Sequence, residues 1–138
     1  MWASRQVILT LAVIAAGLAG CAANLAPRQI AAASADHDAR ELTDAVALAV
    51  NLKYDQSAAI LERLLPRLHA YGQTDQAAEA TFWLAFSREK QGRASEAAEL
   101  YRRVTQLYGG TSAAAQARLR LGRLEKSSGT GVTTAPRP

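Results

Sequence analysis

The chain has 138 residues and a formal net charge of +4, because 16 lysines and arginines outnumber 12 aspartates and glutamates. The excess is small and the two signs are interleaved, which argues against a nucleic-acid-binding protein. Apolar residues make up 49% of the chain and aromatic residues 6%, a balance typical of helices that pack closely through alanine. The length allows one small domain with additional terminal segments.

The first residues predict an export signal. Arg5 provides a positive charge, and the apolar run over 7–18 that follows is too short to cross a bilayer comfortably. The sequence Leu-Ala-Gly-Cys ending at Cys21 resembles the lipobox of bacterial lipoproteins at all four positions. That resemblance implies that the chain is cut before Cys21, whose thiol is diacylated and whose new amino group is commonly acylated too. Residues 1–20 are then a lipoprotein signal peptide.

The alternative is an ordinary signal peptide whose small-residue cleavage site happens to contain a cysteine. Lipidation is the favoured interpretation, because Cys21 is the only cysteine of the chain and an unpaired cysteine in an exported protein needs an explanation. Residues 21–37 are alanine-rich, include Pro27 and lack a repeated apolar face, so we expect a flexible tether. A short amphipathic helix over 22–35 is the alternative there.

Apolar spacing predicts five helices within a domain over 38–126. The first begins near Asp38, with Glu41 at capping-box spacing. After a short break, Asp55 can cap the second helix. Pro66 predicts a kink or an early end of that helix, because proline removes a backbone hydrogen bond and clashes with the preceding turn.

Glycines mark the ends of the later helices. The third helix is expected to end at Gly92, and the fourth continues to the pair at 109–110. Thr111 or Ser112 can cap a fifth helix that ends near residue 126. Residues 127–138 have little apolar surface to bury, so we expect them to be disordered.

A repeated pattern of small residues links these helices. A shift of 40 residues places Ala45 on Ala85, and a shift of 37 places Ala85 on Gly122. The residues expected to set the packing of the repeats are Ala45, Ala85, Gly92, Ala97, Tyr101 and Gly122. Their offsets resemble those of tetratricopeptide repeats (TPRs), in which small residues let helices approach closely. The resemblance implies a short all-α solenoid of two TPR-like hairpins, over about 40–74 and 77–110, with a capping fifth helix. An unrelated five-helix bundle is the alternative.

In TPR proteins, the first helix of each hairpin lines a concave groove. The resemblance implies that the groove residues here are Phe82, Phe86, Glu89, Lys90, Leu119, Arg123 and Lys126. Phe82 and Phe86 lie one helical turn apart and can hold an apolar side chain of a partner peptide. The alternative is that both phenylalanines belong to the core. Arg118, Arg120 and Arg123 form a basic cluster, for which simple solvation is the alternative to binding a carboxylate or a lipid headgroup.

Little in the sequence suggests catalysis. His37 and His69 are the only histidines. His37 with its two aspartate neighbours can be drawn as a metal site, but adjacent residues in a flexible stretch lack the geometry of a closed site. We therefore expect a protein that is not an enzyme and that holds no metal and no cofactor.

Lipobox and TPR-like repeats together resemble periplasmic adaptor lipoproteins of envelope assembly machines. This implies a non-catalytic adaptor that is anchored by lipid on Cys21 and binds a protein partner in envelope assembly or maintenance, with no role for nucleic acid. Ala22, in place of an aspartate, favours the periplasmic side of the outer membrane, and the inner membrane is possible. The alternatives are a self-associating structural or assembly lipoprotein, whose open repeat ends stack, and an enzyme.

Overall fold

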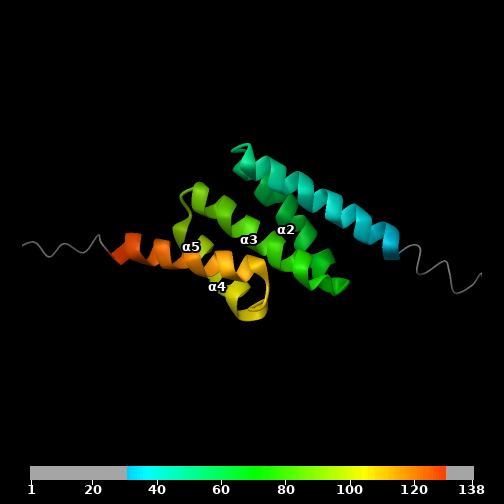
Figure 1. Cartoon of the computed structure of the whole chain (residues 1–138). Helices are drawn as coiled ribbons and strands as arrows, with labels where there is room; N and C mark the ends of the chain where they lie inside the picture. The colour runs from blue at the N-terminus through cyan, green and yellow to red at the C-terminus, as the bar shows by residue number, and fades with distance from the viewer. Residues whose placement is uncertain (1–30, 130–138) are drawn as a thin grey trace, which may run out of the picture. The chain divides into compact units, whose positions relative to one another are not determined.

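A computed structural model describes residues 31–129 of the chain (Figure 1). Those residues form five helices joined by short turns, with no strand among them. The helices are one over 31–50, α2 (Tyr54–Ala70), α3 (Thr74–Lys90), α4 (Ala94–Leu107) and α5 (Ser112–Gly129). The predicted all-α class is confirmed. The signal peptide, Cys21 and residues 130–138 lie outside the described residues.

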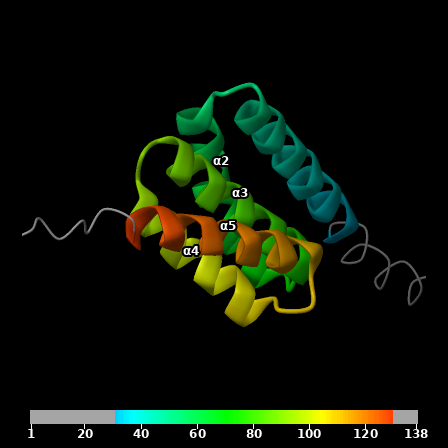
Figure 2. The same cartoon turned by 60° about the vertical axis from the view of Figure 1, so that its left-hand side comes forward.

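Contacts along the chain divide it after His37, and the unit that begins at Asp38 holds the helical domain. Within this unit the helix over 38–50 pairs with α2, and α3 pairs with α4 (Figure 2). α3 also packs on α2, and α5 packs on α4 and contacts α3. Each helix therefore meets mainly its neighbours in the chain, the arrangement of a short helical solenoid that the sequence predicts.

Burial repeats at the predicted shift of 40 residues. Ala45 and Ala85 both have no exposed surface. Leu64 and Val104, which are also 40 residues apart, are both fully buried too. Tyr101 is also fully buried, in a cluster that joins α3, α4 and α5. The two hairpins thus present equivalent positions to the core, which lies along the whole length of the solenoid.

Three turns between helices share one backbone geometry. Leu52, Gly72 and Gly92 have φ angles of 62°, 65° and 78°, at intervals of twenty residues. The amide that follows each of them donates a hydrogen bond of 2.9 Å to the carbonyl five residues earlier, at residues 48, 68 and 88. This is the pattern that satisfies the last carbonyls of a helix and usually requires glycine. Leu52 adopts the same conformation although, unlike glycine, it has a Cβ atom.

The first helix begins earlier than predicted. Residues 31–37 are helical, so this part of the expected tether over 21–37 is wrong, and the high helix propensity of alanine explains the difference. Asp38 consequently lies inside a helix and does not cap one. Its carboxylate and that of Glu41 instead accept hydrogen bonds from Arg67 of α2.

The other differences lie at helix ends. α2 continues through Pro66 to Ala70, so an early end there is wrong. Leu64 and Leu68 are fully buried on either side of the proline, and their packing holds this turn although Pro66 donates no backbone hydrogen bond. No side chain caps α2, so the cap predicted at Asp55 is wrong.

At the last helix the predicted cap is correct. Thr111 accepts a hydrogen bond of 3.2 Å from the amide of Ala114 through its hydroxyl oxygen. α5 then runs to Gly129, which makes residues 127–129 helical and not disordered.

Candidate functional site

The predicted groove residues divide between the core and the surface. Phe82 is only 4% exposed and packs against Tyr101, with ring centroids 5.7 Å apart, so most of its side chain belongs to the core. Phe86 lies at the half-buried edge of the same helix. Phe82 and Phe86 are four residues apart, slightly more than one helical turn of about 3.6 residues, so their rings point in different directions about the helix axis. This difference places Phe82 in the core and Phe86 nearer the surface. Leu119, Arg123 and Lys126 are exposed on α5.

Phe86 is the centre of an aromatic and cationic cluster. Its ring meets those of Trp83 and Tyr54 edge to face, with centroids 5.4 Å and 6.1 Å away. The guanidinium carbon of Arg120 lies 4.5 Å from the Phe86 centroid, and Nζ of Lys90 lies 5.4 Å from it. These distances are those of cation–π contacts. The faces of Phe86 are thus already occupied by cations of α3 and α5.

Glu89 links this cluster to the core. It accepts a 2.8 Å hydrogen bond from the hydroxyl of Tyr101 and a 3.1 Å bond from Nη1 of Arg120. Burial, together with the bond to Glu89, raises the pKa of Tyr101 well above its usual value. Both predicted groove residues Glu89 and Phe86 therefore have structural partners within the chain.

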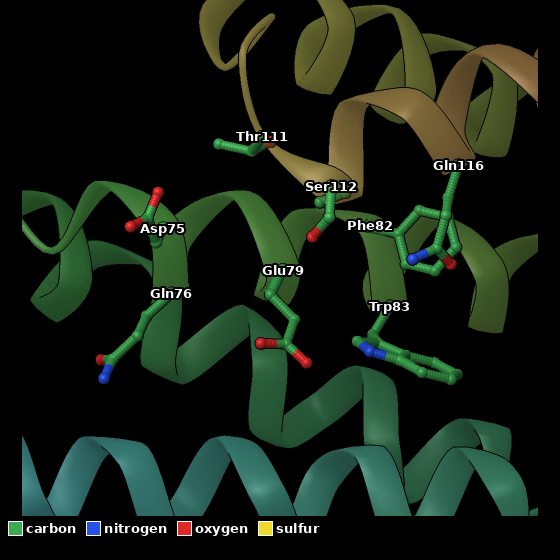
Figure 3. A pocket seen from close by; sticks show the side chains of 9 residues that line it. Asp75, Gln76, Glu79, Phe82, Trp83, Thr111, Ser112 and Gln116 are labelled. Atoms are coloured by element: carbon green, nitrogen blue, oxygen red, sulfur yellow. The ribbon is translucent and has the colours of Figure 1, made fainter.

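A hollow of about 510 Å³ opens between α3 and α5 (Figure 3). α3 lines it with Asp75, Gln76, Glu79, Phe82 and Trp83, and α5 contributes Gln116. A second hollow, of about 280 Å³, lies between α3 and the first helix, whose contribution is residues 39–46. Gln76 and Glu79 line both. The two hollows therefore adjoin at these two side chains of α3, and together they are called the groove below.

The groove face of α3 follows a single helical row. Gln76, Glu79, Trp83, Phe86 and Lys90 recur at intervals of three or four residues, which places them on one side of the helix. The carboxylate lies near the start of α3 and the ammonium near its end, so the row runs from an acidic to a basic end. Trp83 and Phe86 lie between them.

The sequence prediction found the basic end of this row but missed the acidic end. Asp75 and Glu79 are like charges one helical turn apart with no basic residue one turn further on, where Trp83 stands instead. Two like charges at that spacing are unfavourable in an isolated helix, and this was the available sequence signal for the acidic end.

The expected cluster of Arg118, Arg120 and Arg123 does not act as one unit. Arg118 donates to the carbonyl of Gly109, whereas Arg120 pairs with Glu89.

The remaining predicted site residues serve packing and turns. Ala45, Ala85 and Ala97 have no exposed surface, and Gly92 forms one of the three equivalent turns. Gly122 differs, because a Cβ built there would meet no heavy atom within 4 Å. Close helix approach is therefore not the reason for glycine at this position, and that prediction is wrong.

Within residues 31–129 no group of three His, Cys, Asp or Glu side chains is placed to hold a metal ion. Asp38, drawn above with His37 as a metal site, is buried and bonded to Arg67. Among the helices described, none is both long enough and apolar enough to cross a membrane.

No family model matches the chain, and no curated protein or solved structure matches it significantly.

Proposed function

We propose that the chain is a lipid-anchored, periplasm-facing adaptor with TPR-like repeats, which binds a protein partner in cell-envelope assembly or maintenance and does no chemistry itself. The lipobox-like sequence ending at Cys21 supports the anchor. Sorting to the outer membrane is supported by Ala22, which stands where an aspartate favours retention in the inner membrane.

The observation that carries the binding role is the composition of the groove face of α3. Trp83 is a half-buried aromatic side chain of the groove and lies next to Glu79, which is exposed; Lys90 is exposed further along the same row. An aromatic ring between opposite charges suits a peptide segment, because the ring provides apolar contact area while the charges fix its direction. A small polar substrate would need several convergent polar groups in an enclosed pocket, whereas this groove is open along its length.

In-cell photo-crosslinking of the full chain tests the role. A reactive residue is placed at position 43 or 116, which lie on opposite walls of the groove and are both exposed. The matched control is position 106, which is exposed on α4. We expect the same envelope protein in adducts from positions 43 and 116, lost when Trp83 is replaced by Ala, and absent from position 106.

A different set of proteins at each position, or adducts that persist in the Trp83→Ala variant, would contradict groove binding. Adducts that contain only a second copy of this chain would instead support the self-associating lipoprotein, and light scattering would then show a mass that rises with concentration.

A further inference from the structure

The inference concerns which side chain of the partner enters the groove, and it rests on the proposed function. Half of the twelve carboxylates of the described region already hold a cation. Asp38, Glu41, Glu62, Glu89, Glu96 and Glu125 each pair with an arginine. Asp75 and Glu79, which line the hollow between α3 and α5, have no hydrogen bond or ion pair with any described residue.

These two carboxylates lie one turn apart on the same helix face. Like charges at this spacing destabilise a helix. A cation bound between them removes the repulsion and gains attraction from both. Among the described residues, the two cations beside this row do not supply it, because Arg120 and Lys90 are held over Phe86 at the other end of the row.

A buried oxygen adds a second requirement. Oε1 of Gln76 lines the same groove, is inaccessible to solvent and has no hydrogen-bond donor among the described residues. A buried acceptor without a hydrogen bond is unfavourable. A ligand with several N–H groups provides a positive charge, and it provides a donor for this oxygen when the Gln76 side chain turns toward the hollow.

The aromatic wall of the hollow is also without a cation. Figure 3 shows the carboxylate of Glu79 and the ring of Trp83 on the same side of α3, with Gln116 of α5 across the hollow. Phe86, one turn further along, already has a guanidinium 4.5 Å from its centroid, whereas no described cation lies over Trp83. Indole is the strongest of the aromatic side chains in attracting cations.

We propose that the hollow between α3 and α5 receives an arginine side chain of the partner protein. Guanidinium has five N–H donors in a plane, so it donates to carboxylate and amide oxygens while it stacks on an aromatic ring. Glu79 provides the carboxylate and Trp83 the ring, and the oxygen of Gln76 becomes an acceptor when this side chain turns toward the hollow. Asp75 adds negative charge at the mouth, and a lysine ammonium matches this set less well because it cannot stack as a plane.

The test uses the lipidated chain that begins at Cys21, in detergent, in which Trp83 is the only indole because Trp2 belongs to the signal peptide. Three capped peptides, Ala-Leu-Xaa-Leu-Ala with arginine, lysine or citrulline at the centre, are titrated at constant ionic strength. The indole N–H resonance of Trp83 is followed by NMR. We expect the arginine peptide to shift this resonance and to bind about tenfold more tightly than the uncharged citrulline peptide, with the lysine peptide between them.

Glu79→Gln should reduce the affinity for the arginine peptide about fivefold. The matched control is Glu99→Gln, which removes the same charge from an exposed position on α4 and should leave the affinity unchanged. Equal affinity for the arginine and citrulline peptides, or equal effects of the two substitutions, would overturn the proposal.

Crosslinking separates this result from failure of the proposed function. If position 116 still captures the partner in cells at full yield when Glu79→Gln is present, the arginine pocket is wrong and groove binding stands. If groove positions capture no common partner, the proposed function itself is wrong.

Discussion

The hydroxyl of Tyr101 donates a 2.8 Å hydrogen bond to Oε2 of Glu89, and this bond connects the buried side of α4 to the groove side of α3. Tyr101 has no exposed surface, whereas Glu89 also holds Arg120 of α5. One carboxylate thus joins three helices at the level of the groove.

Tyr101→Phe removes this bond without changing the packing volume of the ring. We expect the free energy of unfolding to fall by about 1–2 kcal/mol, because the acceptor is charged and partly buried. Urea unfolding followed by circular dichroism measures the change. Tyr71→Phe is the control, since Tyr71 is 62% exposed, and an equal loss in both variants would contradict the structural role of the bond.

Stability should also fall at alkaline pH because of Tyr101. Burial raises the pKa of its hydroxyl in the folded chain above the ordinary value of 10.0. Above about pH 10 the unfolded chain loses this proton while the folded chain keeps it, so the unfolded state binds fewer protons and stability declines as the pH rises. Melting temperatures across this range should decline less steeply for Tyr101→Phe, and identical slopes would contradict the assignment.

Arg67 should be the most sensitive of the paired arginines. Asp38 is 2% exposed, and Nη2 of Arg67 lies 3.0 Å from its Oδ1. Arg67→Gln leaves that carboxylate buried without a charged partner, so we expect a loss of about 2–4 kcal/mol in urea unfolding. Arg63→Gln should lose less than about 1 kcal/mol, because the Arg63 side chain is 65% exposed in its pair with Glu41. Adding Asp38→Asn to Arg67→Gln should restore part of the loss.

Leu52→Gly should stabilise the fold. Leu52 has a φ of 62° and is 72% exposed, so its side chain adds strain and little packing. The left-handed conformation is unfavourable by about 1–2 kcal/mol for a residue with a Cβ, and the extra freedom of glycine in the unfolded chain offsets part of it. We expect a net gain of about 0.5–1 kcal/mol.

Gly72→Ala and Gly92→Ala, at the equivalent turns, should each destabilise by about 1 kcal/mol. Differential scanning calorimetry of the three variants measures both effects. A loss for Leu52→Gly similar to that of the two alanine variants would show that the three turns are not equivalent.

Cys21→Ala tests the membrane anchor. Without the thiol no diacyl chain is attached, so we expect the protein to move from the membrane fraction to the soluble fraction of the cell envelope. Intact mass measurement of the wild-type chain should show the added lipid. A variant that stays in the membrane fraction, beside a wild type that carries no lipid, would contradict the lipobox interpretation.

Local features of this chain follow from its sequence. Ala45 and Ala85 could be predicted as buried because helix period and residue size are properties of a short window. The turn at Gly92 could be predicted as well. The turn at Leu52 could not be predicted from residue type, because this geometry usually requires glycine and no glycine is present there. The helices on either side set its geometry.

Long-range pairing could not be predicted. Asp38 and Glu41 have the spacing of a helix cap, and only the position of Arg67 in space reveals their actual partner. The candidate binding face was therefore only partly predictable. The repeat register places Phe86 and Lys90 on one side of α3. Which of Phe82 and Phe86 is more deeply buried depends on the rotation of α3 against α4 and α5. The role of Glu79 depends on which arginines are already paired elsewhere.

The twenty-residue spacing of the equivalent turns has a consequence for how the chain can change in length. Any segment that begins after one of these turns and ends after another starts and finishes on the same backbone geometry. A duplicate of residues 54–93 inserted after Arg93 would therefore join the chain without new turn chemistry. Gene duplication in such steps lengthens the groove by whole hairpins, so the fold permits longer partners to be accommodated while each turn stays as it is.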